Sequence, residues 1–266
     1  NQKISTLKEV GVKIMKRTTA FGLYDYGVVG LLERITDHQS LPSEFDPRQR
    51  FWTVRTKHII LATGAIERPI AFGNNDRPGV MSVNAALTYL NRFAILPGKK
   101  IIVCTNNDSA YQSAIELSKA GAEVKLFDAR SEVNDDLSGQ AIQNDVDLRM
   151  NSAPLNVNGF RRVKSLNLAE AKNNTWQKGN TEYCDLALVS GGWSPVVHLL
   201  SHRGIRPIWD KQNACFVANK CSEPITVAGS AAGIWEKNNC IASGIAAGVE
   251  AADNLGIKTK SISFPS

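Results

Sequence analysis

One stretch of the sequence, residues 99–130, constrains the fold more than any other, because it is patterned as strand, tight turn, helix and strand. Residues 101–104 and 124–127 are short apolar runs of the kind that form buried parallel strands. From Ala110 onward the apolar residues recur with a helical period, and Gly121 is placed to end the helix. The pattern predicts a strand–helix–strand unit in a parallel sheet, the framework of many dinucleotide-binding sites.

The turn of this unit departs from the glycine fingerprint G-x-G-x-x-G/A, whose positions here hold Thr105, Asn107 and Ala110. The fingerprint needs a tight turn, room for a pyrophosphate against the backbone, and a small third residue. Ala110 is small, but Thr105 is β-branched and the Asn107 side chain fills space that a phosphate needs. Asp128 is placed to bind a ribose hydroxyl and would favour NAD. Two interpretations stay open: a working nucleotide turn, or a structural module in which Asp128 is a solvated strand-end carboxylate.

The flanking segments predict a second, interrupted domain around this unit. Residues 18–55 have the pattern of a three-stranded antiparallel meander, and residues 57–62 that of a buried strand. A late strand at residues 225–228 is expected to return to the same domain. We therefore predict a discontinuous first domain, residues 1–80 and 205–266, and an inserted second domain, residues 81–204.

Two small-residue turns of the first domain are placed where the backbone passes close to another group. The strand at 57–62 ends in Ala62-Thr63-Gly64, and the late strand leads into Gly229-Ser230-Ala231-Ala232-Gly233. The second turn precedes a helix at residues 240–255, whose small residues suggest tight backbone packing. The N–H groups of this second turn can be directed at an anion. A purely structural turn of small residues is the alternative.

The start of the chain predicts an incomplete first domain. Its first residues are patterned as a helix ending at Gly11, followed by a strand at residues 12–15. Because an α/β domain normally begins with a strand before such a helix, we expect the first strand and its glycine fingerprint to lie upstream of Asn1.

Charge and hydropathy argue against two kinds of partner. The net charge of +6 is spread along the chain without a basic block, so we expect no nucleic-acid partner. No apolar run approaches the roughly 18 residues of a membrane span, so we expect no membrane segment. The polar first residues are not those of a secretory signal.

Cysteine and histidine spacing argue against a metal centre or a redox dithiol. The five cysteines include no C-x-x-C pair and favour a reducing, cytoplasmic location. His198 and His202 share a helical spacing, but no nearby glutamate completes a metal-binding motif. No nucleophile–base pair and no pair of catalytic carboxylates can be recognised, so we assign no metal ligand and no catalytic residue.

Four runs of the sequence, RTTAFGLYDYGVV, LATGAIERP, GNNDRPGVM and TNNDSAYQSA, are specific in combination. Together with the strand–turn patterns they resemble flavoproteins with two dinucleotide-binding domains, the relatives of glutathione and thioredoxin reductases. Within that superfamily they resemble the alpha subunits of heterotetrameric sarcosine oxidases, over nearly the whole chain. The resemblance implies an α/β fold with two interleaved Rossmann-like domains, three layers that include an antiparallel meander, and a first domain truncated at its N-terminus.

The resemblance also implies an activity for the whole complex. Such complexes oxidatively demethylate sarcosine to glycine, form hydrogen peroxide from oxygen and pass the methylene group to tetrahydrofolate. The alpha subunit holds NAD in its first nucleotide domain, and the complex also carries FAD and FMN. The implied partners are the beta, gamma and delta subunits, and a folate-binding domain would follow Ser266. This fragment alone is expected to be inactive.

The family's cofactor site maps onto positions in or beside the two small-residue turns of the first domain and the meander. These positions are Ala20, Ala62, Thr63, Gly64, Gly229, Ser230, Ala231, Ala232, Gly233, Asn238 and Asn239. The second domain keeps a degenerate fingerprint at Thr105, Asn107, Ala110 and Asp128.

Three other functions stay open. The first is a self-contained NAD(P)H–flavin oxidoreductase of the thioredoxin-reductase type, which would need an intact glycine fingerprint upstream. The second is the alpha subunit of a related opine, proline or cyanide-forming oxidase. The third is a non-catalytic scaffold whose nucleotide folds are vestigial.

Overall fold

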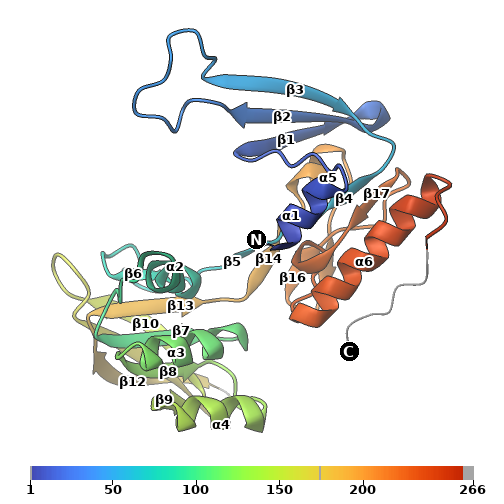
Figure 1. The fold of residues 1–266 in the computed structure, drawn as a ribbon. Helices are drawn as coiled ribbons and strands as arrows, with labels where there is room; N and C mark the ends of the chain where they lie inside the picture. The colour runs from blue at the N-terminus through green and yellow to red at the C-terminus, as the bar shows by residue number, and fades with distance from the viewer. Residues whose placement is uncertain (1, 174, 260–266) are drawn as a thin grey trace. The chain divides into compact units, whose positions relative to one another are not determined.

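The computed structural model describes residues 2–173 and 175–259 and divides into two units (Figure 1). Unit 1 contains the chain up to Ala65 and from Pro195 onward, and unit 2 is the continuous segment Ile66–Ser194. These limits differ from the boundaries expected at residues 80 and 204. The segment after Ala65 groups with unit 2 because its residues pack there: Gly73 bridges to Asn156, and neighbouring apolar side chains join a core of unit 2.

Unit 2 is built on a five-stranded parallel sheet. Its strands, in spatial order, are β6 (Val80–Ser82), β13 (Leu186–Ser190), β7 (Lys100–Thr105), β8 (Glu123–Asp128) and β9 (Val146–Arg149). All five residues of β13 and all but the first of β7 are buried. Strands buried on both faces read as unbroken apolar runs, which is why the sequence pattern predicted β7 and β8 correctly.

Three helices pack together against this sheet with one apolar core. They are α2 (Val83–Phe93), α3 (Ser109–Lys119) and α4 (Asp135–Gln143). Ser82 begins α2 as an N-cap, its hydroxyl accepting a hydrogen bond from the Ala85 N–H, and Asn134 caps α4 in the same way. Ala110 and Ala114 of α3 are fully buried, so the small residue at the third fingerprint position does allow close packing of helix and strand.

A second antiparallel meander forms the other layer of unit 2. It consists of β10 (Ser152–Asn158), β11 (Ser165–Lys172) and β12 (Thr175–Tyr183). A separate core lies between this meander and the parallel sheet, with Leu166 and Leu168 facing Ile102 and Val189. Unit 2 is therefore a three-layer Rossmann-like domain, and its meander is one that the sequence analysis did not identify.

Unit 1 begins with helix α1 (Gln2–Glu9) and a meander of β1 (Thr18–Tyr24), β2 (Val28–Arg34) and β3 (Gln49–Arg55). A 3-10 turn, η1 (Asp25–Gly27), joins β1 to β2. Residues 12–15, predicted as a strand, form none. The Val12 N–H instead donates to the Leu7 carbonyl, closing α1 around a left-handed Gly11.

The rest of unit 1 centres on two short parallel strands, β4 (Ile59–Leu61) and β17 (Ile225–Val227), which pair with each other. The long helix α6 (Lys237–Asn254) packs on both. A 3-10 turn, η2 (Gly229–Ala232), lies between β17 and α6. The remaining elements of unit 1 are α5 (His198–His202) and the hairpin of β15 (Ile208–Asp210) and β16 (Cys215–Val217). The limits of the two units along the chain fall within the paired strands β5 (Ala65–Glu67) and β14 (Trp193–Pro195).

The small residues of α6 do not all serve tight packing. A Cβ added at Gly244 or Gly248 would meet no described atom within 4 Å, whereas Ala247 is buried. The sequence-based explanation of close backbone packing is therefore wrong for these two glycines.

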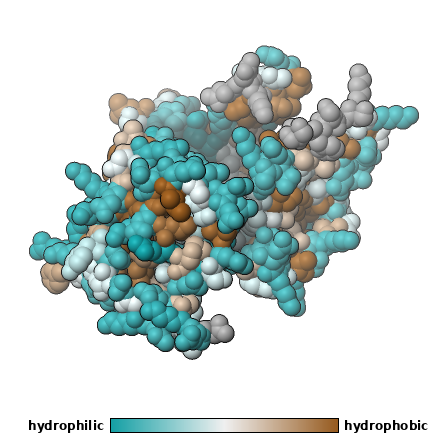
Figure 2. Space-filling view, turned by 90° about the horizontal axis from the view of Figure 1, so that it is seen from below, coloured by the Kyte–Doolittle hydropathy of each residue, from teal (hydrophilic) through white to brown (hydrophobic). Residues whose placement is uncertain are grey.

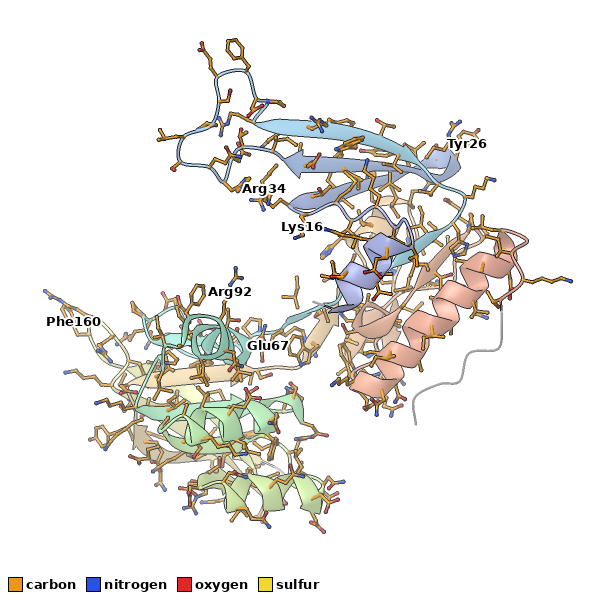
Figure 3. The ribbon with its side chains drawn as sticks, in the orientation of Figure 1. Lys16, Tyr26, Arg34, Glu67, Arg92 and Phe160 are labelled. Carbon is orange, nitrogen blue, oxygen red and sulfur yellow. The ribbon has the colours of Figure 1, made fainter. Side chains whose placement is uncertain are left out.

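Surface apolar residues are scattered over both units. Tyr26 in the β1–β2 turn and Phe160 in the β10–β11 turn are 86% and 89% exposed (Figure 3). The face in Figure 2 shows hydrophobic patches separated by hydrophilic side chains. Within the described part of the chain, no helix has both the length and the apolar character needed to cross a membrane.

Candidate functional site

The structure brings the two predicted turns of unit 1 to the same sheet edge. In the parallel pair of β4 and β17, Leu61 lies opposite Val227, and the Ala228 N–H donates to the Leu61 carbonyl at 3.0 Å. Each strand runs directly into its turn, Ala62-Thr63-Gly64 or Gly229–Ala232 with Gly233. A Cβ placed on Gly64 would lie 4.0 Å from the Ser230 hydroxyl, so the two turns approach closely.

Glycine is required at these turns for two physical reasons. Gly64, Gly229 and Gly233 have φ values of +78°, +66° and +78°, which L side chains rarely adopt. At Gly233 an added Cβ would also lie 2.8 Å from Cγ1 of Val217 in β16. The turns therefore expose backbone with few side-chain atoms, and Ala62 and Thr63 are exposed.

The N-terminus of α6 is capped by a residue that sequence reasoning did not select. Glu236 accepts hydrogen bonds from the Asn238 N–H at 3.0 Å and from the Asn239 N–H at 2.7 Å. These two bonds hold the pKa of Glu236 below its usual value. The N–H groups of these two residues, which belong to the mapped cofactor site, are thus bonded to a carboxylate of the chain itself.

Two further residues fix the turns and were also missed. Ser243, in the second turn of α6, accepts a hydrogen bond from the Gly229 N–H at 3.2 Å. The Val196 carbonyl accepts a hydrogen bond from the Thr63 hydroxyl at 2.7 Å, and the Val196 N–H donates to the Gly64 carbonyl. The bonds of Val196 join segments that are far apart in sequence, and nothing in the local pattern of either segment indicates the pairing.

Ala20 is placed apart from the two turns. It lies in β1, is exposed, and pairs with Leu31 in the meander sheet rather than in the β4–β17 sheet. Its role in cofactor binding stays a prediction.

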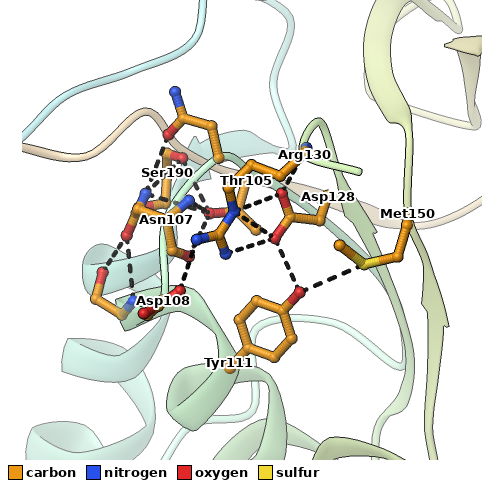
Figure 4. A network of polar contacts seen from close by, with 10 residues as sticks. Thr105, Asn107, Asp108, Tyr111, Asp128, Arg130, Met150 and Ser190 are labelled. Atoms are coloured by element: carbon orange, nitrogen blue, oxygen red, sulfur yellow. Dashed lines mark hydrogen bonds and ion pairs between the residues drawn. The ribbon is translucent and has the colours of Figure 1, made fainter. Parts of the chain in front are cut away.

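In unit 2, the turn after β7 is closed by its own side chains (Figure 4). The Asn107 amide nitrogen lies 3.0 Å from the Ser190 carbonyl oxygen and 3.2 Å from Oγ1 of Thr105. Its amide oxygen accepts from the N–H and hydroxyl of Ser109, at 3.2 and 2.6 Å. Neither Thr105 nor Asn107 is among the described residues with positive φ, so this turn does not use the glycine-like conformation of the fingerprint.

Asp128 is fully buried at the end of β8 and is surrounded by donors. Its carboxylate accepts from the Tyr111 hydroxyl at 2.8 Å and from the Arg130 guanidinium at 2.7 Å. Arg130 also pairs with Asp108 at 2.7 Å. The structure therefore overturns the interpretation of Asp128 as a solvated strand-end residue.

The network shifts the acid–base properties of two members. Burial raises the pKa of Tyr111, and the hydrogen bond to Asp128 raises it further. For Arg130, burial acts to lower the pKa, but the hydrogen bonds to Asp128 and Asp108 together outweigh it and raise the net value. Both shifts favour the protonated form of the group.

A hollow of about 400 Å³ lies elsewhere in unit 2, between β9 and the meander. Its lining includes Phe127, Leu148, Arg149 and Lys172, and none of the predicted site residues. Arg149 pairs with Asp147 and Lys172 with Glu170. The hollow thus presents paired charges together with the polar residues Asn151, Ser152 and Asn180.

The structure also locates the histidines considered as metal ligands. Nδ1 of His202 lies 2.9 Å from the Leu23 carbonyl oxygen, which ties α5 to β1. Across the described residues, no three or more His, Cys, Asp or Glu side chains gather in a way that could hold a metal ion.

Curated proteins similar to this chain share one description, sarcosine oxidase subunit alpha. The protein from Rhizobium meliloti (strain 1021) is 36% identical over 249 residues, covering 92% of this chain and 24% of that protein. The protein from Corynebacterium sp. (strain P-1) is 34% identical over 248 residues, covering 92% of this chain and 26% of that protein. This chain therefore spans about a quarter of the length of the curated relatives it matches. No family model matches the chain.

Solved structures similar to this chain establish its fold. Thioredoxin reductase from T. acidophilum has a TM-score of 0.65 at 13% identity, covering 96% of this chain and 78% of that one. L-Proline dehydrogenase from P. horikoshii has a TM-score of 0.60 at 20% identity, covering 98% of this chain and 46% of that one. The fold is an α/β Rossmann type with a parallel sheet, as predicted.

Proposed function

The chain is homologous, over 92% of its residues, to one segment of the sarcosine oxidase alpha subunit, and from this premise we propose that it is the NAD-holding part of such a subunit. NAD is bound at the turns of unit 1. The complete assembly oxidises sarcosine to glycine, with the beta, gamma and delta subunits as partners and tetrahydrofolate as methylene acceptor. The location is the cytoplasm.

The observation that carries the proposal is the meeting of two glycine turns at the ends of β4 and β17. In open α/β sheets, ligands bind outside the carboxyl ends of parallel strands. The left-handed Gly64 and Gly229 give that edge a backbone surface without Cβ atoms, which suits a bulky dinucleotide.

The residues of the turns fit binding rather than bond-breaking. The hydroxyl oxygens of Thr63 and Ser230 can accept hydrogen bonds from a ligand, but the two turns contain no titratable side chain. A nicotinamide or flavin nucleotide supplies redox chemistry when bound. In our proposal the substrate's oxidation belongs to FAD and FMN elsewhere in the complex, and unit 1 binds and orients its nucleotide.

NAD-dependent thermal unfolding tests the proposal. In the complete protein, NAD at a hundredfold excess over its dissociation constant should stabilise unit 1 by about 2.7 kcal/mol. Gly64→Ala should weaken this effect because it adds a Cβ in the turn. The matched control is Gly204→Ala, since Gly204 has the same φ of +78° and open space around it, outside the turns.

The outcomes separate the other functions. Absence of any NAD effect would contradict the proposal and favour a non-catalytic scaffold. The likeness to thioredoxin reductase supports a self-contained NAD(P)H–flavin oxidoreductase as second candidate. That candidate predicts a yellow protein when the subunit is purified alone. A sarcosine-inactive complex that oxidises proline or an opine would instead assign it to those related oxidases.

A further inference from the structure

We propose that unit 2 is a nucleotide-binding fold whose ligand has been replaced by the chain's own side chains, so that it takes up no dinucleotide. The inference concerns the polar network in Figure 4, which joins the ends of β7, β8 and β13. The inference rests on the proposed function in one respect, because it assigns nucleotide binding in this chain to unit 1 alone.

The network occupies the place where a ligand would enter the sheet. From β7 the chain continues to β8 and β9 on one side, while β13 lies on the other side of β7. The order therefore reverses between β7 and β13, and ligands of such sheets bind at that switch point. Here Thr105, at the end of β7, and Asn107 both bond to Ser190, at the end of β13. Side chains thus bridge the two strand ends beside which a ligand would bind.

The same side chains use the donors that a pyrophosphate would need. Phosphates bind at such turns through backbone N–H groups near the helix N-terminus. The Asn107 N–H donates to Oγ1 of Thr105 at 3.1 Å, and the N–H of Ser109, the first residue of α3, donates to the Asn107 side chain. The Trp193 indole N–H then donates to the Ser109 hydroxyl at 2.8 Å. An incoming phosphate would have to break these bonds.

The ribose position is closed as well. A strand-end carboxylate binds ribose hydroxyls only if its oxygens can be reached. Both Asp128 oxygens accept bonds within the chain, from Tyr111, from the Arg130 guanidinium and from the Arg130 N–H at 2.9 Å. The carboxylate has 0% exposure. Freeing it would leave a buried charge without its partner, which is strongly unfavourable.

The three closures are coupled through neighbouring residues. Asp108, beside Asn107, holds the outer side of the Arg130 guanidinium, whose inner side holds Asp128. Replacing only Thr105 or only Asn107, the residues at the two glycine positions of the fingerprint, therefore does not open the site. This coupling distinguishes an internally filled fold from an empty site with one unfavourable side chain.

Hydrogen exchange with and without NAD, read by mass spectrometry on the complete protein, tests the inference. We expect NAD to leave exchange unchanged at residues 105–112 and 128–130, and to slow it at the unit 1 turns. Slow exchange at residues 101–104 in both samples shows that unit 2 is folded. Calorimetric titration of the same sample should give at most one NAD per chain, with affinity lowered at least tenfold by Gly64→Ala and unchanged by Gly204→Ala.

The two proposals fail in different ways. NAD-dependent protection at residues 105–112 that persists in the Gly64→Ala variant would overturn the inference, as would two NAD molecules per chain. Protection in neither unit would contradict NAD binding in unit 1 and still support the closed unit 2. Repeating both measurements with NADP extends the test to a nucleotide whose extra phosphate Arg130 could bind. NADP binding that slows hydrogen exchange at residue 130 would likewise overturn the inference.

Discussion

Asn107 stands where dinucleotide sites carry a glycine, and its amide group makes contacts within the chain that a ligand would otherwise make. Sequence reasoning identified the position and the steric conflict there. It could not identify Ser190 as the bonding partner, because that residue is distant in sequence and is brought near only by the parallel pairing of β7 and β13. Whether this turn binds a nucleotide was therefore undecidable from the residues alone.

Replacing Asn107 by alanine should destabilise unit 2. The substitution removes bonds to Ser190, Thr105 and Ser109, and partly buried polar groups that lose a partner cost about 1–3 kcal/mol. Thermal unfolding would measure the loss as a drop in Tm. Asn75→Ala, at an exposed turn position of the same unit, is the control and should change Tm little. Equal or increased stability of Asn107→Ala would show that the network is not structural.

Thiol reactivity should differ sharply among the cysteines. Burial raises the pKa of Cys104, and it raises that of Cys184 to about 12. At pH 8 roughly one Cys184 in ten thousand then carries the reactive thiolate. Alkylation followed by mass spectrometry should label half-buried Cys221 and Cys240 first, and Cys104 and Cys184 only after denaturation. Equal labelling rates in the native protein would contradict this expectation.

At the scale of elements, strands buried on both faces were the most predictable. β7, β8 and β13 appear as apolar runs because the parallel sheet is covered on both sides. Short elements with local alternatives were not predictable: residues 12–15 are apolar enough for a strand, yet the left-handed Gly11 ends α1 there. The caps and fixing bonds of α6, from Glu236 and Ser243, also depend on three-dimensional placement.

The cap of α6 predicts a pH dependence. The pKa of Glu236 is lowered by the Asn238 and Asn239 N–H groups, so the ionised carboxylate stabilises the folded state. That contribution is fully present above the ordinary glutamate value of 4.5 and is lost as the pH falls through the lower folded-state value. Glu236→Gln should lower Tm at pH 7, and the difference from wild type should shrink below pH 4. A pH-independent difference would contradict the assignment.

The open glycines of α6 predict a stabilising substitution. Gly248 lies in the helix interior with no described atom within 4 Å of an added Cβ, and alanine is favoured over glycine in helices by about 1 kcal/mol. Gly248→Ala should therefore raise the free energy of unfolding in denaturant titrations by about that amount. Gly233→Ala, where φ is +78° and Val217 is 2.8 Å from the new Cβ, should lower it. A loss of stability at Gly248 would mean that another surface packs there.

At the scale of the whole molecule, the sequence predicted a continuous domain inserted into a discontinuous one, but it did not predict the limits of the two contact units. The loop at residues 69–80 looks like a crossover because it is rich in proline, glycine and asparagine. Its pairing with Asn156 and its apolar contacts place it in unit 2 instead. Composition therefore predicts that a segment is a loop, but it does not predict against which apolar core the loop packs.

Unit 2 should fold by itself. It is one continuous segment, Ile66–Ser194, and every residue of its two apolar cores lies within those limits. The excised segment should therefore unfold cooperatively, with equal calorimetric and van't Hoff enthalpies. Differential scanning calorimetry would measure this. A broad, non-cooperative transition would show that the segment needs the rest of the chain.

The pairing of β4 with β17 has a consequence for biosynthesis. The two strands are neighbours in the sheet, yet all of unit 2 is encoded between them. When β4 leaves the ribosome its partner has not been made, whereas the continuous segment that follows can complete its own sheet first. The strand β4 therefore stays without its partner until β17 has been translated. Chaperone demand during synthesis should fall on this unpaired strand.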